Sequence, residues 1–278
     1  MSRRGGITLP RGDGERPRAL TIAGSDSGGG AGIQADLKTF GALGVYGMTA
    51  ITAVTVQNTK GVSGYEELSP QTVGEQIRAV VTDIGVDSAK TGMLASAAIV
   101  EAAAEALAET RVPNLVVDPV FMSKHGHPLL ADDAVEALRE RILPLATLVT
   151  PNLPEASGLA GFRVDSAASM KEAAEAIRSF GPRAVLVKGG HLSGDRSDDL
   201  FFDGTRLLWV EGERIDTPNT HGTGCVLSSA ITAYLARGDD LLTAVRRGKS
   251  FVTQAIRHGL AIGQGIGPVD PLWEIPPP

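Results

Sequence analysis

Short apolar runs alternate with longer amphipathic stretches along most of the chain. The runs are apolar at nearly every position, which is typical of strands covered by helices on both faces of a parallel sheet. Two further short runs, 200–202 and 207–210, flank Asp203-Gly204, a pair typical of a hairpin turn. We predict parallel strands at 19–23, 49–56, 87–90, 115–118, 146–150 and 184–188.

Helical periodicity fills the intervals between these runs. Apolar residues recur at helical spacing from Val73 to Ile84, after Ser69 as the expected N-cap and Pro70 at the first helical position. Strands that alternate with helices predict an α/β fold in which a mostly parallel sheet lies between two helix layers. Further helices are predicted after the first strand, where Ile33, Leu37 and Phe40 share a face, at 98–107 after Ser96, and at 226–235.

The alternating pattern extends over residues 18–273 without a long linker or an internal repeat, which favours a single domain. Residues 1–17, rich in Gly, Pro and Arg, and residues 274–278, which end in three prolines, are expected to be flexible tails.

Charge and composition exclude several classes of protein. A net charge of -6 with interspersed acids and bases provides no basic surface for nucleic acid. No apolar run approaches the roughly 18 residues of a membrane span, and no apolar segment follows the first arginines as in a secretion signal. The only cysteine is Cys225, so an intrachain disulfide framework is excluded. We expect a cytoplasmic protein that binds neither nucleic acid nor membrane.

Glycines cluster where the first predicted strand ends, in the segment 24–32 that reads G-S-D-S-G-G-G-A-G. Ligands bind at the carboxyl ends of parallel strands, and glycines there let the backbone approach them closely. The segment lacks the G-K-[ST] of a Walker A loop and the spacing of a dinucleotide fingerprint. A phosphate- or substrate-facing loop and a simple flexible turn are both compatible with it.

Polar residues follow other predicted strands. Gln57 stands at the end of the second strand, where its amide can match a ring nitrogen beside an amine, although a solvated glutamine is the commoner case. Asp118 ends the run 115–118. Asn152 and Glu155, three residues apart after Thr150-Pro151, can organise water around Mg²⁺, or Asn152 can simply cap a helix. Lys188 ends the run 184–188 and can neutralise phosphate charge, or remain solvated.

The segment 219–225, N-T-H-G-T-G-C, runs directly into the predicted helix 226–235. The backbone N–H groups of Gly222, Gly224 and Cys225 would gather at the positive end of that helix and form an anion site. The same position is expected to favour the thiolate of Cys225, which would suit a base or an orienting group for a substrate hydroxyl. A buried, inert cysteine is the alternative. Neither His191 nor His221 has a partner at metal-ligand spacing, so no zinc site is predicted.

Taken together, seven segments resemble the hydroxymethylpyrimidine/phosphomethylpyrimidine kinases, members of the ribokinase superfamily. The resemblance covers about residues 18–268 and includes A-G-S-D-S-G-G-G-A-G-I-Q-A-D-L-K-T at 23–39, Q-N-T at 57–59, K-T-G-M-L at 90–94 and V-D-P-V at 117–120. It continues with T-P-N-L-P-E-A at 150–156, V-K-G-G-H at 187–191 and N-T-H-G-T-G-C at 219–225. His125 departs from the small residue usual in the family and is expected to affect how its loop covers a second phosphate.

The resemblance implies a ribokinase-like three-layer α/β/α fold and a homodimer. It implies that ATP and Mg²⁺ are used to phosphorylate 4-amino-5-hydroxymethyl-2-methylpyrimidine and then its monophosphate. Gln57 would bind the aminopyrimidine, within a pocket of Gly24, Ala31, Asp36, Thr55, Met93 and Val120. Catalysis would involve Cys225, Lys188 and the anion site of Gly222, Thr223 and Gly224. ATP would be bound by Asp118, Asn152, Glu155, Lys188 and Thr223, with Asp118 and Glu155 serving the metal, partly through water.

Two rival functions remain. Related enzymes with a cysteine at this place accept vitamin B6 alcohols, so a pyridoxal or pyridoxine kinase is the nearest alternative. A ring without an adjacent amine would gain less from Gln57. A sensor that binds the pyrimidine without catalysis would be expected to have lost part of the phosphate machinery, whereas Lys188 and the glycines before Cys225 are all retained.

Overall fold

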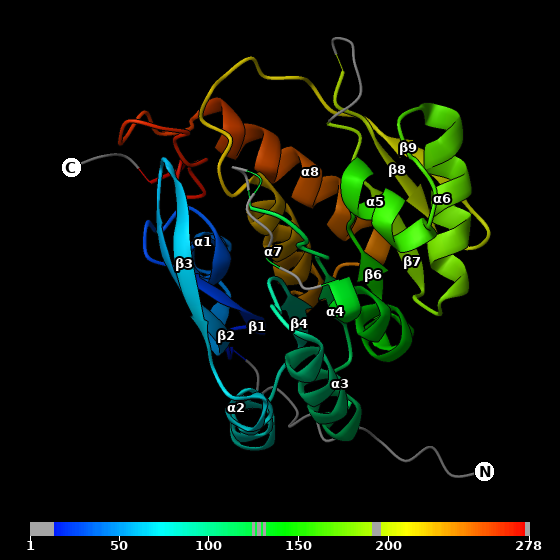
Figure 1. Cartoon of the computed structure of the whole chain (residues 1–278). Helices are drawn as coiled ribbons and strands as arrows, with labels where there is room; N and C mark the ends of the chain where they lie inside the picture. The colour runs from blue at the N-terminus through cyan, green and yellow to red at the C-terminus, as the bar shows by residue number, and fades with distance from the viewer. Residues whose placement is uncertain (1–13, 124–125, 127–128, 130–131, 191–195, 276–278) are drawn as a thin grey trace.

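A single twisted sheet of nine strands runs through the protein (Figure 1). The computed structural model describes residues 14–123, 126, 129, 132–190 and 196–275. The strand order is β3-β2-β1-β4-β5-β6-β7-β8-β9, and the pairings from β2 to β7 are all parallel. The strands are β1 Arg18–Asp26, β2 Tyr46–Asn58, β3 Gly61–Glu67, β4 Ser88–Thr91, β5 Leu115–Val117, β6 Leu148–Val149, β7 Ala184–Val187, β8 Asp199–Phe202 and β9 Leu207–Val210.

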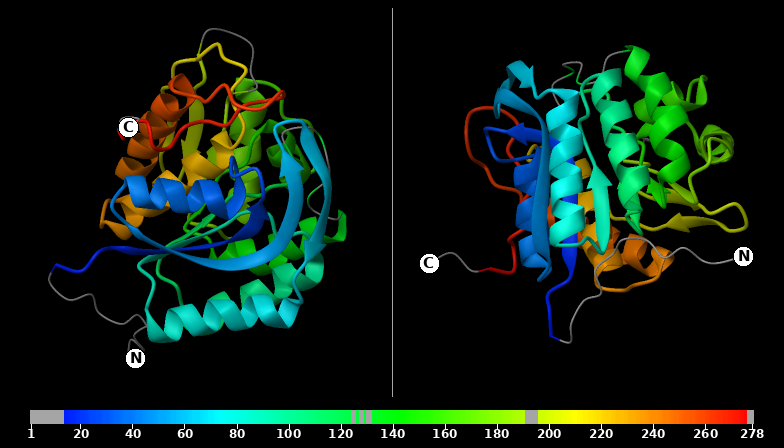
Figure 2. Two further views of the ribbon diagram at one scale, coloured as in Figure 1. Left: turned by 90° about the vertical axis from the view of Figure 1, so that its left-hand side faces the viewer. Right: turned by 90° about the horizontal axis from the view of Figure 1, so that it is seen from below.

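Helices cover both faces of the sheet and complete a three-layer α/β/α arrangement (Figure 2). One apolar core packs α2 to α6 against one face, and a second packs α1, α7 and α8 against the other. The helices are α1 Gly32–Ala42, α2 Pro70–Asp83, α3 Ala97–Thr110, α4 Asp132–Ala137, α5 Leu153–Ala160, α6 Ala167–Ser179, α7 Thr223–Ala236 and α8 Leu241–Arg257; a π-helical turn Leu138–Ile142 and a 3-10 turn Leu143–Leu145 follow α4.

The central strands confirm the reading of continuous apolar runs as doubly covered strands. Val116 and Leu148 face the core that contains α7 and α8, whereas their neighbours Val117 and Val149 face the opposite core, and all four are fully buried. Successive side chains of a strand point to opposite faces, so each strand contributes to both cores. This double burial fixes the register that brings the strand ends to one edge.

Local signals act as the sequence predicts at α2 but not at α3. Ser69 caps α2 by accepting a hydrogen bond from the N–H of Thr72 at 3.1 Å, and Pro70 opens the helix. Ser96 does not cap α3 with its side chain; its hydroxyl donates instead to Glu67 on β3 at 2.6 Å. A carboxylate acceptor brought in by tertiary structure outcompetes the local helix cap.

Several elements extend beyond the sequence prediction. The predicted hairpin forms β8 and β9 around Gly204, whose φ of 91° suits glycine. Strand β3, which pairs antiparallel with β2, and helices α6 and α8 are additional. Most residues of the predicted tails, and the positions of His125 and His191, lie outside the described residues. Within the described ranges, no helix is long and apolar enough to cross a bilayer.

Candidate active site

A cavity of about 880 Å³ lies where the parallel strands end. The carboxyl ends of parallel strands meet at one edge of a sheet, so β1, β5, β6 and β7 deliver their following residues to the same space. Every predicted site residue except Asp36 lines the cavity: Gly24, Ala31, Thr55, Gln57, Met93, Asp118, Val120, Asn152, Glu155, Lys188, Gly222, Thr223, Gly224 and Cys225.

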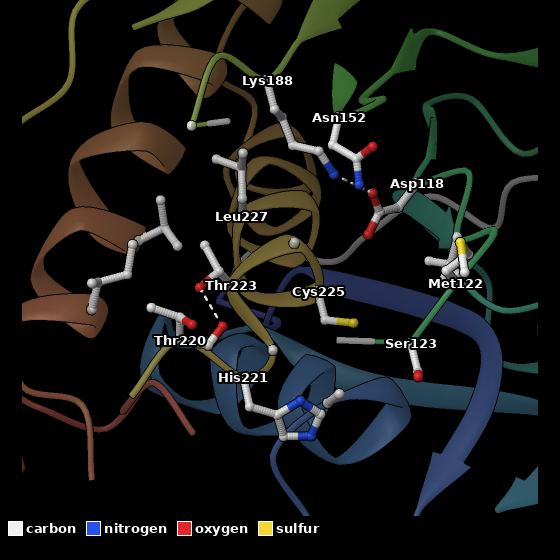
Figure 3. Close-up of a pocket in the computed structure, with 18 of the residues that line it drawn as sticks. Asp118, Met122, Ser123, Asn152, Lys188, Thr220, His221, Thr223, Cys225 and Leu227 are labelled. Carbon is white, nitrogen blue, oxygen red and sulfur yellow. Dashed lines mark hydrogen bonds and ion pairs between the residues drawn. The ribbon is translucent and has the colours of Figure 1, made fainter. Parts of the chain in front are cut away.

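Lys188 and two carboxylates form an ionic cluster at the cavity, and Figure 3 shows the pair of Lys188 and Asp118. The Lys188 ammonium lies 2.9 Å from Oδ1 of Asp118 and 3.7 Å from Oε2 of Glu155. Thr150 also donates to Asp118, at 3.1 Å. Two acids therefore hold the lysine in place, and it is not simply solvated at a strand end. Its ammonium group also lines the cavity.

The two acids of this cluster have pKa values shifted in opposite directions. Burial raises the pKa of Asp118, but Lys188 and Lys90 outweigh burial and hold that pKa below its usual range. Burial raises the pKa of Glu155 to about 7 against the attraction of Lys188, and Asp118 adds to the rise. Burial lowers the pKa of Lys188, yet both carboxylates outweigh it and the net direction is upward. The cluster holds a firmly charged Lys188–Asp118 pair beside a glutamate that titrates near neutrality.

Asn152 and Glu155 form a reciprocal capping box at the start of α5. Oδ1 of Asn152 accepts from the N–H of Glu155 at 2.9 Å, and Oε2 of Glu155 accepts from the N–H of Asn152 at 2.8 Å. The capping alternative is thus realised, and both residues still line the cavity. The capping box stabilises the start of α5 and also fixes the Glu155 carboxylate beside Lys188.

The N-terminus of α7 opens onto the same cavity (Figure 3). Gly222 caps the helix with a φ of 82°, and a Cβ there would overlap the carbonyl oxygen of Gly30. A Cβ on Gly224 would lie 3.4 Å from Nζ of Lys188, which places this ammonium beside the helix terminus. The hydroxyl of Thr223 donates to the carbonyl of Thr220 at 2.8 Å. The first N–H groups of a helix lack intrahelical acceptors and attract anions, so this terminus has the geometry that suits a phosphate group.

Cys225 lies in the first turn of α7, but its environment opposes the predicted thiolate. Burial raises the pKa of Cys225 to about 12; Lys90 lowers it, whereas Asp36 and Asp118 raise it further. Desolvation and two nearby acids outweigh the helix terminus, because a buried thiolate loses its hydration. The expectation of a favoured thiolate is wrong. A neutral thiol faces the cavity.

The glycine-rich segment is an ordered loop and not a flexible turn. Its organiser is Asp26, whose carboxylate accepts the N–H groups of Gly28 at 2.8 Å, Gly30 at 3.0 Å and Ala31 at 2.8 Å. Burial raises the pKa of Asp26, but hydrogen bonds from His221 and from this loop keep the pKa below its usual range. The sequence prediction missed Asp26, although an acid at the end of a strand and before three glycines was a usable signal.

His221 joins this loop to Gln57. Its Nε2 lies 3.0 Å from Oδ2 of Asp26 and 3.2 Å from the amide Nε2 of Gln57. Gln57 is further held by Thr55, whose hydroxyl lies 3.2 Å from the amide Oε1. Gln57 is therefore anchored at the cavity wall rather than freely solvated. Sequence reasoning considered His221 only as a metal ligand and missed this contact, because 164 positions separate the two residues.

Asp36 does not line the cavity, which corrects its predicted role in binding substrate. The side chain is fully buried in α1, and its carboxylate lies 3.0 Å from the ammonium of Lys90. Hydroxyl groups of Thr21 and Ser229 donate to it at 2.6 and 2.5 Å. All the acceptor capacity of Asp36 is directed into the protein. It supports the floor under Cys225 and has no access to a ligand.

The far end of the cavity contains groups that the sequence prediction did not include. Lys249 from α8 lies 2.8 Å from Oδ2 of Asp199, and Oδ1 of Asp199 accepts the N–H of Gly189 at 2.9 Å. This pair ties α8 to the turn that follows Lys188. Leu227 and Val252 also line the cavity, so apolar side chains lie in the same space as the N-terminus of α7.

Sheet topology and the helix-terminal anion site together place the chain among the ribokinase-like kinases of small molecules. A family model described as phosphomethylpyrimidine kinase matches residues 26–270, and the chain belongs to that family. Hydroxymethylpyrimidine/phosphomethylpyrimidine kinase of Streptomyces coelicolor is 54% identical to it over 93% of this chain and 96% of the relative.

Two solved structures have the same fold. The ADP complex of Bacillus subtilis pyridoxal kinase superposes with a TM-score of 0.87 at 41% identity, over 94% of this chain and 100% of the other. Phosphomethylpyrimidine kinase of Clostridium difficile superposes with a TM-score of 0.77 at 44% identity, over 87% and 100%. The family model and the curated relative confirm the predicted hydroxymethylpyrimidine/phosphomethylpyrimidine kinase, and pyridoxal kinase shares its fold.

Proposed function

We propose that the protein transfers the γ-phosphoryl group of ATP to 4-amino-5-hydroxymethyl-2-methylpyrimidine and then to its monophosphate, giving the diphosphate used in thiamine biosynthesis. The observation that carries the proposal is that Gln57 and the N-terminus of α7 line one continuous cavity. An amide that can pair with an aminopyrimidine and an anion site for phosphate are thereby available to one substrate.

The ring would lie against the wall that contains Gln57. Thr55, Met93 and Val120 line the same cavity. A Cβ on Gly24 would lie 3.1 Å from the sulfur of Met93, so the glycine lets the Met93 side chain pack closely against β1. Ala31, with only a methyl side chain, lines the same cavity. In this arrangement apolar contacts hold the ring and the amide selects its polar edge.

The phosphates of ATP would lie between Lys188 and the N-terminus of α7. Thr223 and Asn152 add polar groups to this part of the cavity. In phosphoryl transfer, positioning and preorganised donors supply most of the catalysis. Lys188 is suited to this role because Asp118 and Glu155 keep it charged and fixed before ATP arrives.

The acids in this cluster fit Mg²⁺ bound largely through water. Asp118 and Glu155 are buried carboxylates at the cavity wall, and Lys188 lies against both. Mg²⁺ bound to nucleotides usually takes one or two carboxylates and completes its shell with phosphate oxygens and water. Within the described ranges, no three His, Cys, Asp or Glu side chains converge as a metal cluster, in agreement with this type of site. Mg²⁺ would neutralise phosphate charge. We expect chelation with EDTA to stop ADP formation and added Mg²⁺ to restore it.

In the transfer, the substrate hydroxyl oxygen bonds to the γ-phosphorus as the bond to the β-phosphate oxygen breaks. The neutral thiol of Cys225 would hold this hydroxyl in line, and the hydroxyl proton would leave with the phosphoryl oxygens or solvent. Backbone N–H groups of Gly222, Thr223 and Gly224 would face the charge that develops on the transferred group.

Assembly and location are part of the same proposal. We propose a homodimer, supported by Val54 and Val56, which are 47% and 64% exposed on β2. Neighbouring exposed apolar residues mark surfaces that associate. Sedimentation equilibrium should give twice the chain mass.

We also propose that the protein is located in the cytoplasm, where ATP is abundant.

The nearest rival is a pyridoxal kinase, favoured by the high structural similarity to the Bacillus subtilis enzyme. Steady-state phosphorylation of the aminopyrimidine alcohol and of pyridoxal, measured side by side by ADP release with ATP and Mg²⁺, distinguishes the two. We expect the larger kcat/KM for the aminopyrimidine. A strong preference for pyridoxal would overturn the proposed substrate, and no ADP release with either alcohol would favour a non-catalytic sensor.

A further inference from the structure

His221 is clamped between the loop of Asp26 and the amide of Gln57. The residue is 5% exposed, and its Nε2 lies within hydrogen-bonding distance of both neighbours, at 3.0 and 3.2 Å. A Cβ on Gly30 would overlap Cδ2 of the imidazole, so the ring packs directly against the glycine loop. The imidazole therefore has little freedom to turn, and its hydrogen bonds have fixed directions.

The Asp26 carboxylate determines where the imidazole carries a proton. Its oxygens accept three backbone N–H groups, from Gly28, Gly30 and Ala31, an environment that favours the ionised form. An ionised carboxylate accepts hydrogen bonds and donates none. The 3.0 Å contact between Oδ2 of Asp26 and Nε2 of His221 thus requires a hydrogen on Nε2.

A protonated Nε2 in turn determines which end of the Gln57 amide faces it. With the amide nitrogen toward His221, two N–H donors would meet at 3.2 Å. The two ends of an amide have nearly the same shape, and hydrogen bonding decides between them. Turning the amide places its carbonyl oxygen toward Nε2 of His221, whose single hydrogen is then shared between this oxygen and Oδ2 of Asp26, so that two donors no longer face each other.

Thr55 supports the same orientation from the other side. Its hydroxyl has one hydrogen, which donates to the carbonyl of Ser25 at 2.9 Å. The amide end of Gln57 that lies 3.2 Å from this hydroxyl then finds an acceptor, which suits the NH₂ group. No donor faces a donor around Gln57 when its carbonyl shares the N–H of His221 with Asp26 and its NH₂ group faces Thr55.

We propose that His221 is the positioning residue that fixes the Gln57 amide in this orientation and thereby sets the preference for a ring with an amine beside a ring nitrogen. The inference rests on the proposed function for the identity of the ring. A 4-aminopyrimidine offers a donor and then an acceptor along its edge, whereas its 4-oxo counterpart offers them in the reverse order. Because the hydroxymethyl group is directed to Cys225, the ring cannot turn to restore the match.

The protonation of His221 is tested directly, without substrate, by ¹⁵N NMR of the protein labelled at histidine nitrogens. His221→Gln assigns the signals. We expect Nε2 of His221 to carry a hydrogen at neutral pH. A neutral ring with its hydrogen on Nδ1 and a bare Nε2 would overturn the orientation, since Gln57 would then donate to His221.

The effect on specificity is tested by comparing kcat/KM for the 4-amino and 4-oxo hydroxymethylpyrimidines. We expect His221→Phe, which removes the donor, to reduce the amino-over-oxo ratio about tenfold or more, through KM of the amino ring more than through kcat. His221→Gln, whose amide N–H can replace the imidazole N–H, should retain most of the ratio. Equal loss on both rings in each variant would indicate a structural role and overturn the proposal.

Failure of the proposed function gives a different result. If the wild-type protein phosphorylates pyridoxal and neither pyrimidine, the ring preference is wrong whatever His221 does. The NMR measurement then still decides whether His221 holds the carbonyl end of Gln57.

Discussion

Lys90 and Asp36 form an ion pair at 3.0 Å, with both side chains fully buried beneath helix α7. Burial lowers the pKa of Lys90, but Asp36 outweighs burial and the net direction is upward, with Cys225 and Asp118 adding to it. The pair therefore remains ionic in the protein interior and supports the floor of the cavity.

Breaking this pair should be costly because it leaves one uncompensated buried charge. We predict that Lys90→Met or Asp36→Asn lowers the free energy of unfolding by about 3–5 kcal/mol, measured by urea denaturation at pH 7. The double variant should recover part of the loss. As a matched control, Arg78→Ala breaks the exposed pair with Glu109 and should leave the unfolding midpoint nearly unchanged. Fully additive losses in the double variant would show that Lys90 and Asp36 are not coupled.

The neutral thiol of Cys225 should react slowly with alkylating agents. At pH 8 a pKa of about 12 leaves about a thousandth of the thiolate present in an ordinary cysteine. We predict alkylation by iodoacetamide slower by about that factor, followed by mass spectrometry. Because Cys225 is the only cysteine, the chain unfolded in urea provides the reference rate. If the folded protein is labelled at the reference rate, Cys225 has an ordinary thiolate fraction and the neutral thiol is contradicted.

Substitution of Cys225 distinguishes orientation from proton transfer. Cys225→Ala should lower kcat by about a hundredfold or less and change KM little, since the group acts on the reacting hydroxyl. Cys225→Ser should keep most of the wild-type rate, because a hydroxyl can hold the substrate hydroxyl in the same way. A serine variant as slow as the alanine variant would indicate that the thiol itself is required.

Glu155 should make the stability of the protein fall as pH rises toward neutrality. Its pKa is raised by burial to about 7 in the folded state, so between about pH 4.5 and 7 the folded protein binds the proton that the unfolded chain has released. The stabilisation from this proton is complete below about pH 4.5 and is lost as pH passes 7. Urea denaturation from pH 5 to 7.5 measures the slope.

Glu155→Gln should flatten that slope, because glutamine keeps an acceptor for the N–H of Asn152 without titrating. Glu101→Gln on the exposed face of α3 controls for the loss of one negative charge. If the slope of stability against pH is unchanged in the Glu155 variant, the titration of another group causes the pH dependence.

Asn152 and Ser166 cap adjacent helices with the same reciprocal geometry. Replacing either by alanine should cost about 1 kcal/mol of unfolding free energy, the usual value for an N-cap. Asn152→Ala alone should also raise KM for ATP, because only this cap lines the cavity and fixes Glu155 beside Lys188. Equal KM values in the two variants would assign Asn152 a purely structural role.

The sequence predicted what depends on local pattern and strand order. Buried apolar runs predicted the parallel strands, and residues at strand ends such as Asp118 and Lys188 reached one cavity because parallel strands end at one edge. The antiparallel strand β3 was missed because residues 61–67 are mostly exposed or half-buried and lack an apolar run.

Errors arose where distant residues decide the outcome. The role of Asp36 depends on Lys90 and Ser229, which lie 54 and 193 positions away. The helix terminus at Cys225 is visible in the sequence, but the burial and the two acids that raise its pKa are not. His221 gained its role only through contacts with Asp26 and Gln57 that folding creates.

The sequential phosphorylation of an aminopyrimidine alcohol is tested most directly by ³¹P NMR of one reaction. The protein is mixed with ATP, Mg²⁺ and 4-amino-5-hydroxymethyl-2-methylpyrimidine, and the spectrum is followed in time. We predict a monophosphate signal that rises first and then gives way to the paired signals of a diphosphate, with matching formation of ADP. A spectrum that retains only ATP and its hydrolysis products, while pyridoxal in the same assay gives a phosphate ester, would contradict the account.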